Sequence, residues 1–374
     1  MVKEFTFGTP NNYIGDITTF NNKLYFSVDD GVNGRELWSS DGTTAGTTLV
    51  QNLVPGVFGS DPRSMVVYGN SMYLTYSDPT YGRQLFKMDA AENFSLVKEI
   101  YPSAGDAQIN NMYVANNTLY FSATSPQYGT ELWSSDGTEV GTNVFDIASG
   151  TNSSNPNYFH WINNKLIFRA QTATSGYEVF VSDGTTLAGT GVLKDIVVGS
   201  GSSYPWSLYE FNGKIYFTAY DAVHGTELWL TDGTEAGTTL VMDLNPGIAD
   251  GFNVNAEPEL YMASFNSRMY LFANDGTHGD ELMILDQAST AGLTEGTTAN
   301  FNLFPNPATT SFTLTNLPSE ATIQLIDQTG RIVTTENTTT QTQSIATNTL
   351  HSGIYFVHVT GKNGETSTQK LVIE

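Results

Sequence analysis

One pattern in the sequence recurs at a nearly constant interval, and it restricts the fold more than any other feature. A strand-like segment occurs six times, and a large apolar side chain follows each start by thirteen residues. The starts are Tyr25, Tyr73, Tyr120, Ile167, Tyr216 and Tyr270, and the ends are Trp38, Phe86, Trp133, Phe180, Trp229 and Met283. Successive copies advance by 48, 47, 47, 49 and 54 residues, so insertions fall outside the paired segment. A period near 50 residues indicates a repeat architecture, because each unit is too small to bury its own apolar face and must stack on its neighbours.

Each copy contains four short strand-like runs, which predicts an all-β fold. In the third copy the runs are 112–115, 118–122, 131–135 and 143–147, all β-branched or aromatic and bounded by Gly, Asn or Asp. Tight Asn–Asn turns join the first two runs, as is typical of hairpins whose central residues need positive φ. Four antiparallel strands repeated around a ring predict a six-bladed β-propeller in residues 1–290.

The two ends of the repeat region predict that the ring is closed. The first five copies finish with a fourth strand, whereas the sixth runs into residues 287–292, which do not resemble one. Residues 2–7 begin like the fourth strand of the second copy, Val97–Ile100, so we expect them to complete the sixth blade. A competing assignment gives that place to residues 297–301. Closure removes an exposed sheet edge that would otherwise invite aggregation.

Composition limits the partners that such a chain can have. The formal net charge is −23 among 374 residues, nearly all of it in the first 300. That charge repels nucleic acid and anionic membrane surfaces, and leaves cations, neutral glycans and basic proteins as partners. With no cysteine, the chain has no disulfide, thiolate metal site or thiol nucleophile. It also shows no export signal and no transmembrane stretch, so we expect that a signal was removed or that a longer protein continues upstream.

A sequence motif marks the third strand of each copy. Residues 36–43, 131–138 and 227–234 read Glu-Leu-Trp, two variable residues and Asp-Gly-Thr, and looser copies begin at Gln84, Glu178 and Glu281. These segments resemble the ELWxxDGT repeat family of bacterial surface and secreted proteins, which implies a scaffold more than a reaction. We expect the Asp to cap its own turn (Asp41, Asp89, Asp136, Asp183, Asp232, Asp286). We expect the Glu to hold backbone or Thr groups, and the Trp, Phe and Met series to form the core between blades.

A ligand is expected where the loops between strands two and three, and those between blades, open around the central channel. One position in the first loop set, just before a glycine, differs from copy to copy and includes aromatic and imidazole side chains suited to a sugar or peptide. The candidate residues on this face are Asn33, Tyr81, Tyr128, Ser175, His224 and His278, with Phe58, Tyr101, Trp206 and Phe252 from the inter-blade loops. The alternative is that these side chains only cover loop backbone.

A search for catalytic motifs gives no strong case for an enzyme. The sequence lacks HExxH, GxSxG and a glycine-rich phosphate loop. Four acidic residues at one repeat position are catalytic or calcium-binding candidates, and two histidines are candidates for a shared metal. The acidic residues are Asp30, Asp78, Asp221 and Asp275, and the histidines are His224 and His278. Acid and base roles demand different environments, so ring repetition argues against catalysis. We expect no catalytic residues and no cofactor, with calcium as an open alternative.

The period stops near residue 301, and the last segment has a different composition, rich in Thr, Gln and Asn. Several short strands predict a small Ig-like β-sandwich in 303–374, after a linker at 291–302. Its landmarks are Pro305, Asn306, Pro307, Gly330, Gly353, Tyr355, Lys370, Leu371 and Val372. They are similar to the type A C-terminal sorting domain of type IX secretion cargo. That resemblance implies passage across the outer membrane through the type IX translocon, handover to an outer-membrane shuttle protein, and surface attachment after cleavage in the linker.

These features together predict a secreted or cell-surface protein. Its propeller is expected to be a binding or adhesion module for a glycan or protein. The alternatives are a propeller glycoside hydrolase or lyase, and a structural spacer of a larger adhesin.

Overall fold

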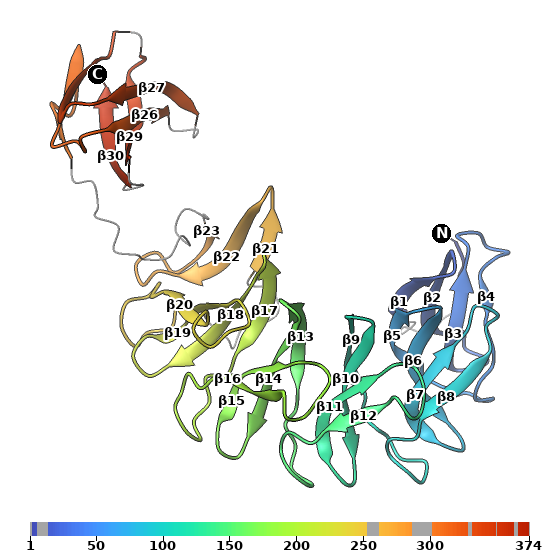
Figure 1. Ribbon diagram of the computed structural model, residues 1–374. Coiled ribbons are helices and arrows are strands. Elements are labelled where there is room, and N and C mark those ends of the chain that lie inside the picture. Colours follow the sequence, from blue (N-terminus) through green and yellow to red (C-terminus); the bar gives the residue numbers. More distant parts are fainter. Residues whose placement is uncertain are drawn as a thin grey trace. The chain divides into compact units, whose positions relative to one another are not determined.

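The structure, a computed structural model, describes residues 2–5, 14–252, 262–285, 301–327, 331–348, 350–362 and 366–373. The chain divides into two compact units, residues 1–286 and 287–374. All regular elements of the described residues are β-strands, which confirms the all-β prediction (Figure 1). None of the described residues forms a helix long and apolar enough to cross a membrane.

Within the part of the first unit that the structure describes, six antiparallel sheets follow one another along the chain (Figure 1). The first three are β1 (Gly15–Phe20), β2 (Lys23–Asp29), β3 (Arg35–Ser40), β4 (Thr48–Leu49); β5 (Arg63–Tyr68), β6 (Ser71–Asp78), β7 (Gly82–Met88), β8 (Phe94–Lys98); and β9 (Asn110–Ala115), β10 (Thr118–Ser125), β11 (Gly129–Ser135), β12 (Asn143–Phe145). The next three are β13 (Asn157–Ile162), β14 (Lys165–Thr172), β15 (Gly176–Ser182), β16 (Thr190–Lys194); β17 (Trp206–Phe211), β18 (Lys214–Asp221), β19 (Gly225–Thr231), β20 (Thr239–Met242); and β21 (Met262–Phe265), β22 (Arg268–Asn274), β23 (Asp280–Leu285).

Neighbouring sheets stack through their apolar faces, and their first strands lie together. Contacts join β1 to β5, β5 to β9, β9 to β13, β13 to β17 and β17 to β21. A separate buried cluster fills each of the five junctions, and each cluster contains the same two repeat positions. The pairs are Leu37 with Met72, Leu85 with Leu119, Leu132 with Leu166, Val179 with Ile215, and Leu228 with Met269. All ten side chains are fully buried, because each apolar face requires a neighbouring sheet to exclude water.

At the two ends of the row, side chains are exposed whose counterparts in the five junctions are buried. Leu24 holds the position of Met72 and is 38% exposed, and Leu282 holds the position of Leu37 and is 69% exposed. Within the described residues the sixth sheet has three strands. Residues 2–5 contact the first sheet: the Phe5 ring lies 5.0 Å from the Trp38 ring, and Lys3 Nζ donates to the Thr47 carbonyl at 2.7 Å. Residues 6–7, and most of the competing segment 297–301, lie outside the described residues.

The turns follow the expected chemistry. Both Asn residues of the turns at 21–22, 116–117 and 163–164 have positive φ. The motif aspartates accept hydrogen bonds from their own turns; Asp136 Oδ1 accepts from the amide of Thr138 at 2.8 Å and from its hydroxyl at 2.7 Å. Asp41, Asp89, Asp183 and Asp232 cap their turns in the same way, which confirms the capping prediction at five positions. Asp286 lies outside the described residues.

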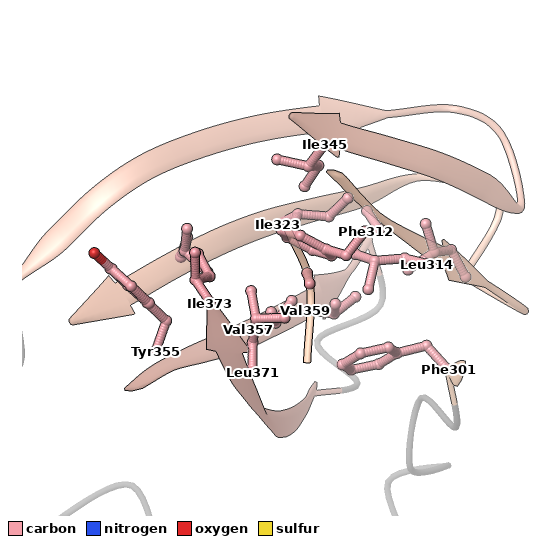
Figure 2. Close-up of a cluster of buried hydrophobic side chains, with 14 residues drawn as sticks. Phe301, Phe312, Leu314, Ile323, Ile345, Tyr355, Val357, Val359, Leu371 and Ile373 are labelled. Atoms are coloured by element: carbon pink, nitrogen blue, oxygen red, sulfur yellow. The ribbon is translucent and has the colours of Figure 1, made fainter. Parts of the chain in front are cut away.

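The second unit has two antiparallel sheets that enclose one core. One sheet contains β24 (Asn302–Phe304), β25 (Ser311–Thr315) and β28 (Thr342–Ala346). The other has β27 (Ile332–Thr338), β26 (Ala321–Asp327), β29 (Gly353–Gly361) and β30 (Thr366–Ile373) in that order. Figure 2 shows Phe301, Phe312, Leu314, Ile323, Val357 and Leu371 converging between them, all 2% exposed or less. Alternation along the strands directs these side chains inward.

Candidate functional site

The motif glutamates are buried anchors for the loops between sheets. Glu131 is 0% exposed, and its carboxylate accepts hydrogen bonds from the amides of Ile147 at 3.1 Å, Ala148 at 3.1 Å and Ser154 at 3.0 Å. The Ser154 hydroxyl donates to the same group. Glu36, Glu178 and Glu227 bind their own loops similarly. The predicted role as a partner for backbone groups is therefore confirmed for these four glutamates. At Glu36, Glu131 and Glu178 a Ser hydroxyl takes the place of the expected Thr.

Burial sets the ionisation of these carboxyl groups. Removal from water raises the pKa of Glu131 and of Glu227 to about 7, although the hydrogen bonds lower it. The second sheet carries Gln84 instead, whose Oε1 accepts from the amides of Ile100 and Tyr101 at 2.8 and 3.1 Å. Its Nε2 donates to three carbonyl groups. An ionised carboxylate could not replace it, because it has no hydrogen to donate. Each loop is thus matched to its own side chain.

Beyond each loop, the next first strand begins with a β-bulge. The bulged residue has a left-handed backbone in every described case, although none is glycine: Asp16 (φ 47°), Ser64 (53°), Asn111 (56°), Tyr158 (59°) and Ser207 (53°). The pairing register shifts at the same places. A positive φ is especially unfavourable for a large side chain such as Tyr158, and bulges re-aim side chains next to binding sites. The scaffold therefore presents, at one regular position, a side chain whose type varies among the sheets.

Three of these bulge residues border a cavity of about 400 Å³ between the first strands of sheets three, four and five. Its walls are Asn111, Met112, Tyr113, Asn157, Tyr158, Phe159, Ser207 and Leu208. The Ser207 hydroxyl oxygen is buried and makes no hydrogen bond with any described residue. A buried hydroxyl without a partner is costly, so it offers an unused donor and acceptor beside the cavity.

An arginine lies against three aromatic side chains, of which Tyr158 lines this cavity. The Arg169 guanidinium carbon is 4.1 Å from the centre of the Trp206 ring and 5.1 Å from the centres of the Tyr158 and Tyr177 rings. Its Nε is buried and has no hydrogen-bond partner among the described residues. Burial lowers the pKa of Arg169, but an arginine remains charged at any ordinary pH. The result is a cation held by rings rather than by a carboxylate.

The structure does not gather the predicted face residues into one site. Phe252 is fully buried in the cluster between sheets five and six, so it cannot meet a ligand, and that prediction is wrong. Ser175 is only 5% exposed and its hydroxyl lies 2.9 Å from that of Thr172. Phe58 is 89% exposed, and Tyr81 and Tyr101 are partly exposed. Tyr128 borders a separate cavity of about 400 Å³ between β8 and β11. Only Trp206 lies in the aromatic cluster around Arg169.

The remaining face residues bind the aspartates of their own turns. Asn33 Nδ2 donates to Asp30 Oδ2 at 2.7 Å, and His224 and His278 pair with Asp221 and Asp275 at 2.8 and 2.7 Å. These aspartates, like Asp78, also accept amide hydrogen bonds from the turn. Among the described ranges no three His, Asp or Glu residues converge as a metal site, and His224 and His278 are not brought together as ligands.

In the second unit, the proline-rich landmark is attached to the last strand. Asn306 Nδ2 donates to the Lys370 carbonyl at 2.7 Å, and the Val372 amide donates to Asn306 Oδ1 at 2.8 Å. The Tyr355 hydroxyl donates to the His351 carbonyl at 2.9 Å, just before Gly353. Leu371 is fully buried. Landmarks far apart in the sequence therefore form one folded element; Gly330 lies outside the described residues.

Comparison with solved structures finds distant similarities. PorZ, a bacterial surface component of the type IX secretion system of Porphyromonas gingivalis, matches all of this chain at 14% identity, with a TM-score of 0.37 and 61% of PorZ covered. The extracellular domain of a putative one-component system from B. thetaiotaomicron matches at 12% identity and a TM-score of 0.42, with 52% of it covered. Prolyl endopeptidases match 94% of this chain at 9% identity and a TM-score of 0.46, with 55% covered. This chain thus spans roughly half to three fifths of these proteins, and such similarity assigns no activity. No curated protein matches.

A sequence family matches the end of the chain. Residues 302–374 match the family described as secretion system C-terminal sorting domain, over the segment whose landmarks are joined through Asn306. This domain marks proteins that are exported by the type IX secretion system and attached at the cell surface. The chain is therefore a type IX secretion cargo, located at the cell surface after export.

Proposed function

We propose that the first unit, residues 1–286 and called the repeat unit below, is a non-enzymatic binding or adhesion module for a glycan or protein. The C-terminal domain would bring it to the cell surface through the type IX translocon and an outer-membrane shuttle protein. One observation carries the proposal. A regular scaffold presents different side chains, in a strained left-handed conformation, around a cavity of about 400 Å³. Strained positions that persist in a folded protein cluster at binding sites.

Glycan-array and cell-adhesion measurements on the full chain test this function. We expect selective binding that is lost when Tyr158 is changed to Ala, because Tyr158 supplies a wall of the cavity. The change Val140→Ala, at a side chain that is 90% exposed, is the control. Absence of binding to every glycan and host protein would contradict the proposal. Deleting 301–374 should prevent surface display while leaving the repeat unit folded.

We also propose that the repeat unit belongs to the ELWxxDGT family and closes as a six-bladed propeller. The support comes from the exposed Leu24 and Leu282 side chains at the two ends of the row. Each junction pairs a residue at the Leu37 position with one at the Met72 position, and Leu282 and Leu24 are the two halves of a sixth such pair. Phe5 contributes to the same face as Leu24, where a cavity of about 900 Å³ opens. We also propose that residues 303–374 form an Ig-like sandwich, because two antiparallel sheets there enclose one core.

Cross-linking distinguishes closure from an open row. Because the chain has no cysteine, Leu24→Cys with Leu282→Cys introduces a single reactive pair. A short bismaleimide should join the two sites within one molecule at high dilution. The control pair, Leu24→Cys with Val140→Cys, should not join. Products only between molecules would favour head-to-tail stacking of chains and contradict closure.

A second candidate function is a glycoside hydrolase or lyase, favoured only by the paired Asp221–His224 and Asp275–His278 side chains. Turnover of polysaccharides that Asp221→Asn or Asp275→Asn abolishes would support it. A structural spacer would be favoured if no ligand is found. For calcium, we expect chelation to leave the melting temperature unchanged, because the turn amides already occupy Asp30, Asp78, Asp221 and Asp275. A lower melting temperature would establish a bound cation.

A further inference from the structure

Arg169 replaces a residue that the scaffold uses elsewhere for its own stability. The equivalent positions in four other sheets are Ser27, Thr75, Ser122 and Thr218. In three of these sheets the hydroxyl lies 3.3 to 3.5 Å from a first-strand carbonyl oxygen of the same sheet. Arg169 instead reaches the Trp206 ring of the next sheet. The fourth sheet has therefore exchanged a local hydrogen bond for a charged group that contacts the next sheet.

The charge of Arg169 has no carboxylate partner among the described residues. Three other arginines at the same end of the sheets all contact Asp61: Arg63 at 2.6 Å, Arg83 at 3.0 Å and Arg35 at 3.8 Å. A strongly acidic chain offers many carboxylates, yet none of those in the described ranges lies within ion-pair distance of Arg169. Aromatic rings attract the cation but leave its hydrogen-bonding capacity unused.

The surroundings suit a saccharide better than a peptide. Trp206 and Tyr158 provide flat apolar surfaces, which stack against the C–H face of a sugar ring, and their rings meet edge to face at 6.0 Å. The unpartnered Ser207 hydroxyl and the amide side chains of Asn111 and Asn157 lie at the cavity wall. Small polar groups beside aromatic rings match the many hydroxyl groups of a sugar.

We propose that this cavity, together with the Arg169–Trp206 pair that adjoins it through Tyr158, binds an acidic saccharide. The carboxylate or sulfate of one sugar is held by the Arg169 guanidinium, the sugar ring lies against Trp206 and Tyr158, and its hydroxyl groups bind Ser207 and Asn111. The proposal rests on the binding function above and names its ligand class. A guanidinium binds planar or tetrahedral oxyanions through paired N–H donors, so the anionic group sets specificity while the rings add contact area.

The experiment compares three probes on the full chain: an oligogalacturonate, a sulfated galacto-oligosaccharide and the neutral galacto-oligosaccharide of the same length. Calorimetry and tryptophan fluorescence report binding. We expect one or both acidic probes to bind more tightly than the neutral one, and Arg169→Gln to raise their dissociation constant roughly ten- to hundredfold, the worth of one charge-assisted hydrogen bond. Arg268→Gln removes the same charge at an exposed position of β22 and should leave binding unchanged.

A second variant keeps the test independent of folding. If Arg169→Gln lowers the melting temperature strongly, Ser207→Ala in the bulge should still weaken the binding of all three probes. Because Arg169 is unchanged in that variant, the acidic probes should still bind more tightly than the neutral one. Equal affinity for acidic and neutral probes, or equal effects of Arg169→Gln and Arg268→Gln, would overturn the proposal and leave the general binding function intact. Binding of acidic peptides but of no saccharide would also overturn it. Failure of every ligand class would instead refute the binding function itself.

Discussion

The exchange of Glu for Gln in the second sheet gives a sharp test of how the inter-sheet loops are held. Gln84 is fully buried, and its Nε2 donates to the carbonyl groups of Tyr81, Tyr101 and Gly105 at 2.9, 2.6 and 3.1 Å. The variant Gln84→Glu places a carboxylate oxygen against these three carbonyl oxygens. It loses the donated hydrogen bonds and adds a buried charge, so we expect a loss of about 3–5 kcal/mol in the free energy of unfolding at pH 7 to 8.

The loss of stability in Gln84→Glu should change with pH in one direction. Carbonyl oxygens and burial raise the pKa of the new carboxyl group in the folded state above its unfolded value near 4.3. The folded state then holds more protons than the unfolded state, so the loss of stability grows as pH rises above about 4.3 and is smallest in acid. Urea unfolding from pH 5 to 8, followed by tryptophan fluorescence, measures this slope.

The reverse exchange, Glu131→Gln, is the matched control. The wild-type carboxyl has a folded pKa of about 7 because it is buried, against an ordinary value of 4.5. Its contribution to stability therefore falls as pH rises between these values, by about 3 kcal/mol in all. Glu131→Gln removes this ionisation, so its free energy of unfolding should rise relative to that of wild type as pH rises. The free energy of unfolding of Gln84→Glu should instead fall relative to wild type. A Gln84→Glu variant within about 0.5 kcal/mol of wild type, or pH slopes of the same sign, would refute the reasoning.

Three further predictions concern the core, the sorting unit and a surface pair. Trp133→Ala removes a side chain that is 4% exposed and should cost about 3–5 kcal/mol in urea unfolding; a cost below 1 kcal/mol would argue against a packed junction. Asn306→Ala removes two hydrogen bonds to β30 and should destabilise the second unit by about 1–3 kcal/mol. Cell fractionation should show reduced surface display, and unchanged display would mean that export does not depend on these hydrogen bonds. Asp275 raises the pKa of His278, so any stability from this pair is present in acid and is lost as pH rises through that pKa. NMR titration of Asp275→Asn should return the His278 pKa toward 6.5, and an unchanged value would contradict the pairing.

The repeated parts of the fold were predictable because repetition exposes them. The Leu132 position serves the same packing role in the first five sheets, so alignment of the copies reveals it without coordinates. The Asn–Asn turns and the capping Asp136 follow from local chemistry that acts within a few residues. Burial of Phe252 was not predicted, because a loop aromatic can turn toward either solvent or the junction beneath it, and only the packing of sheets five and six decides.

The candidate site was harder to predict because its residues do not repeat. Arg169 lies in a strand, and its aromatic partners come from β13, β15 and β17, which only the folded structure brings together. One signal was present in the sequence: an arginine stands where four other copies have Ser or Thr. The predicted ligand face was confined to loop residues, so it excluded Arg169 although the inter-blade loops included the neighbouring Trp206. Departures from a scaffold position are therefore as informative as positions that vary throughout.

The scaffold motif and the candidate site are physically connected. Glu131 holds Ser154, and four residues later comes the bulged Tyr158; Glu178 holds Ser203, and four residues later comes the bulged Ser207. The residue after each anchored serine also bonds to the preceding sheet, as the Asn155 amide does to the Thr130 carbonyl at 3.2 Å. Each buried glutamate thus fixes the start of the next first strand, where a left-handed residue would otherwise relax to an extended conformation. In the proposed binding function the motif would therefore act without touching a ligand: it supplies the rigidity that lets a side chain such as Tyr158 hold one position at the cavity.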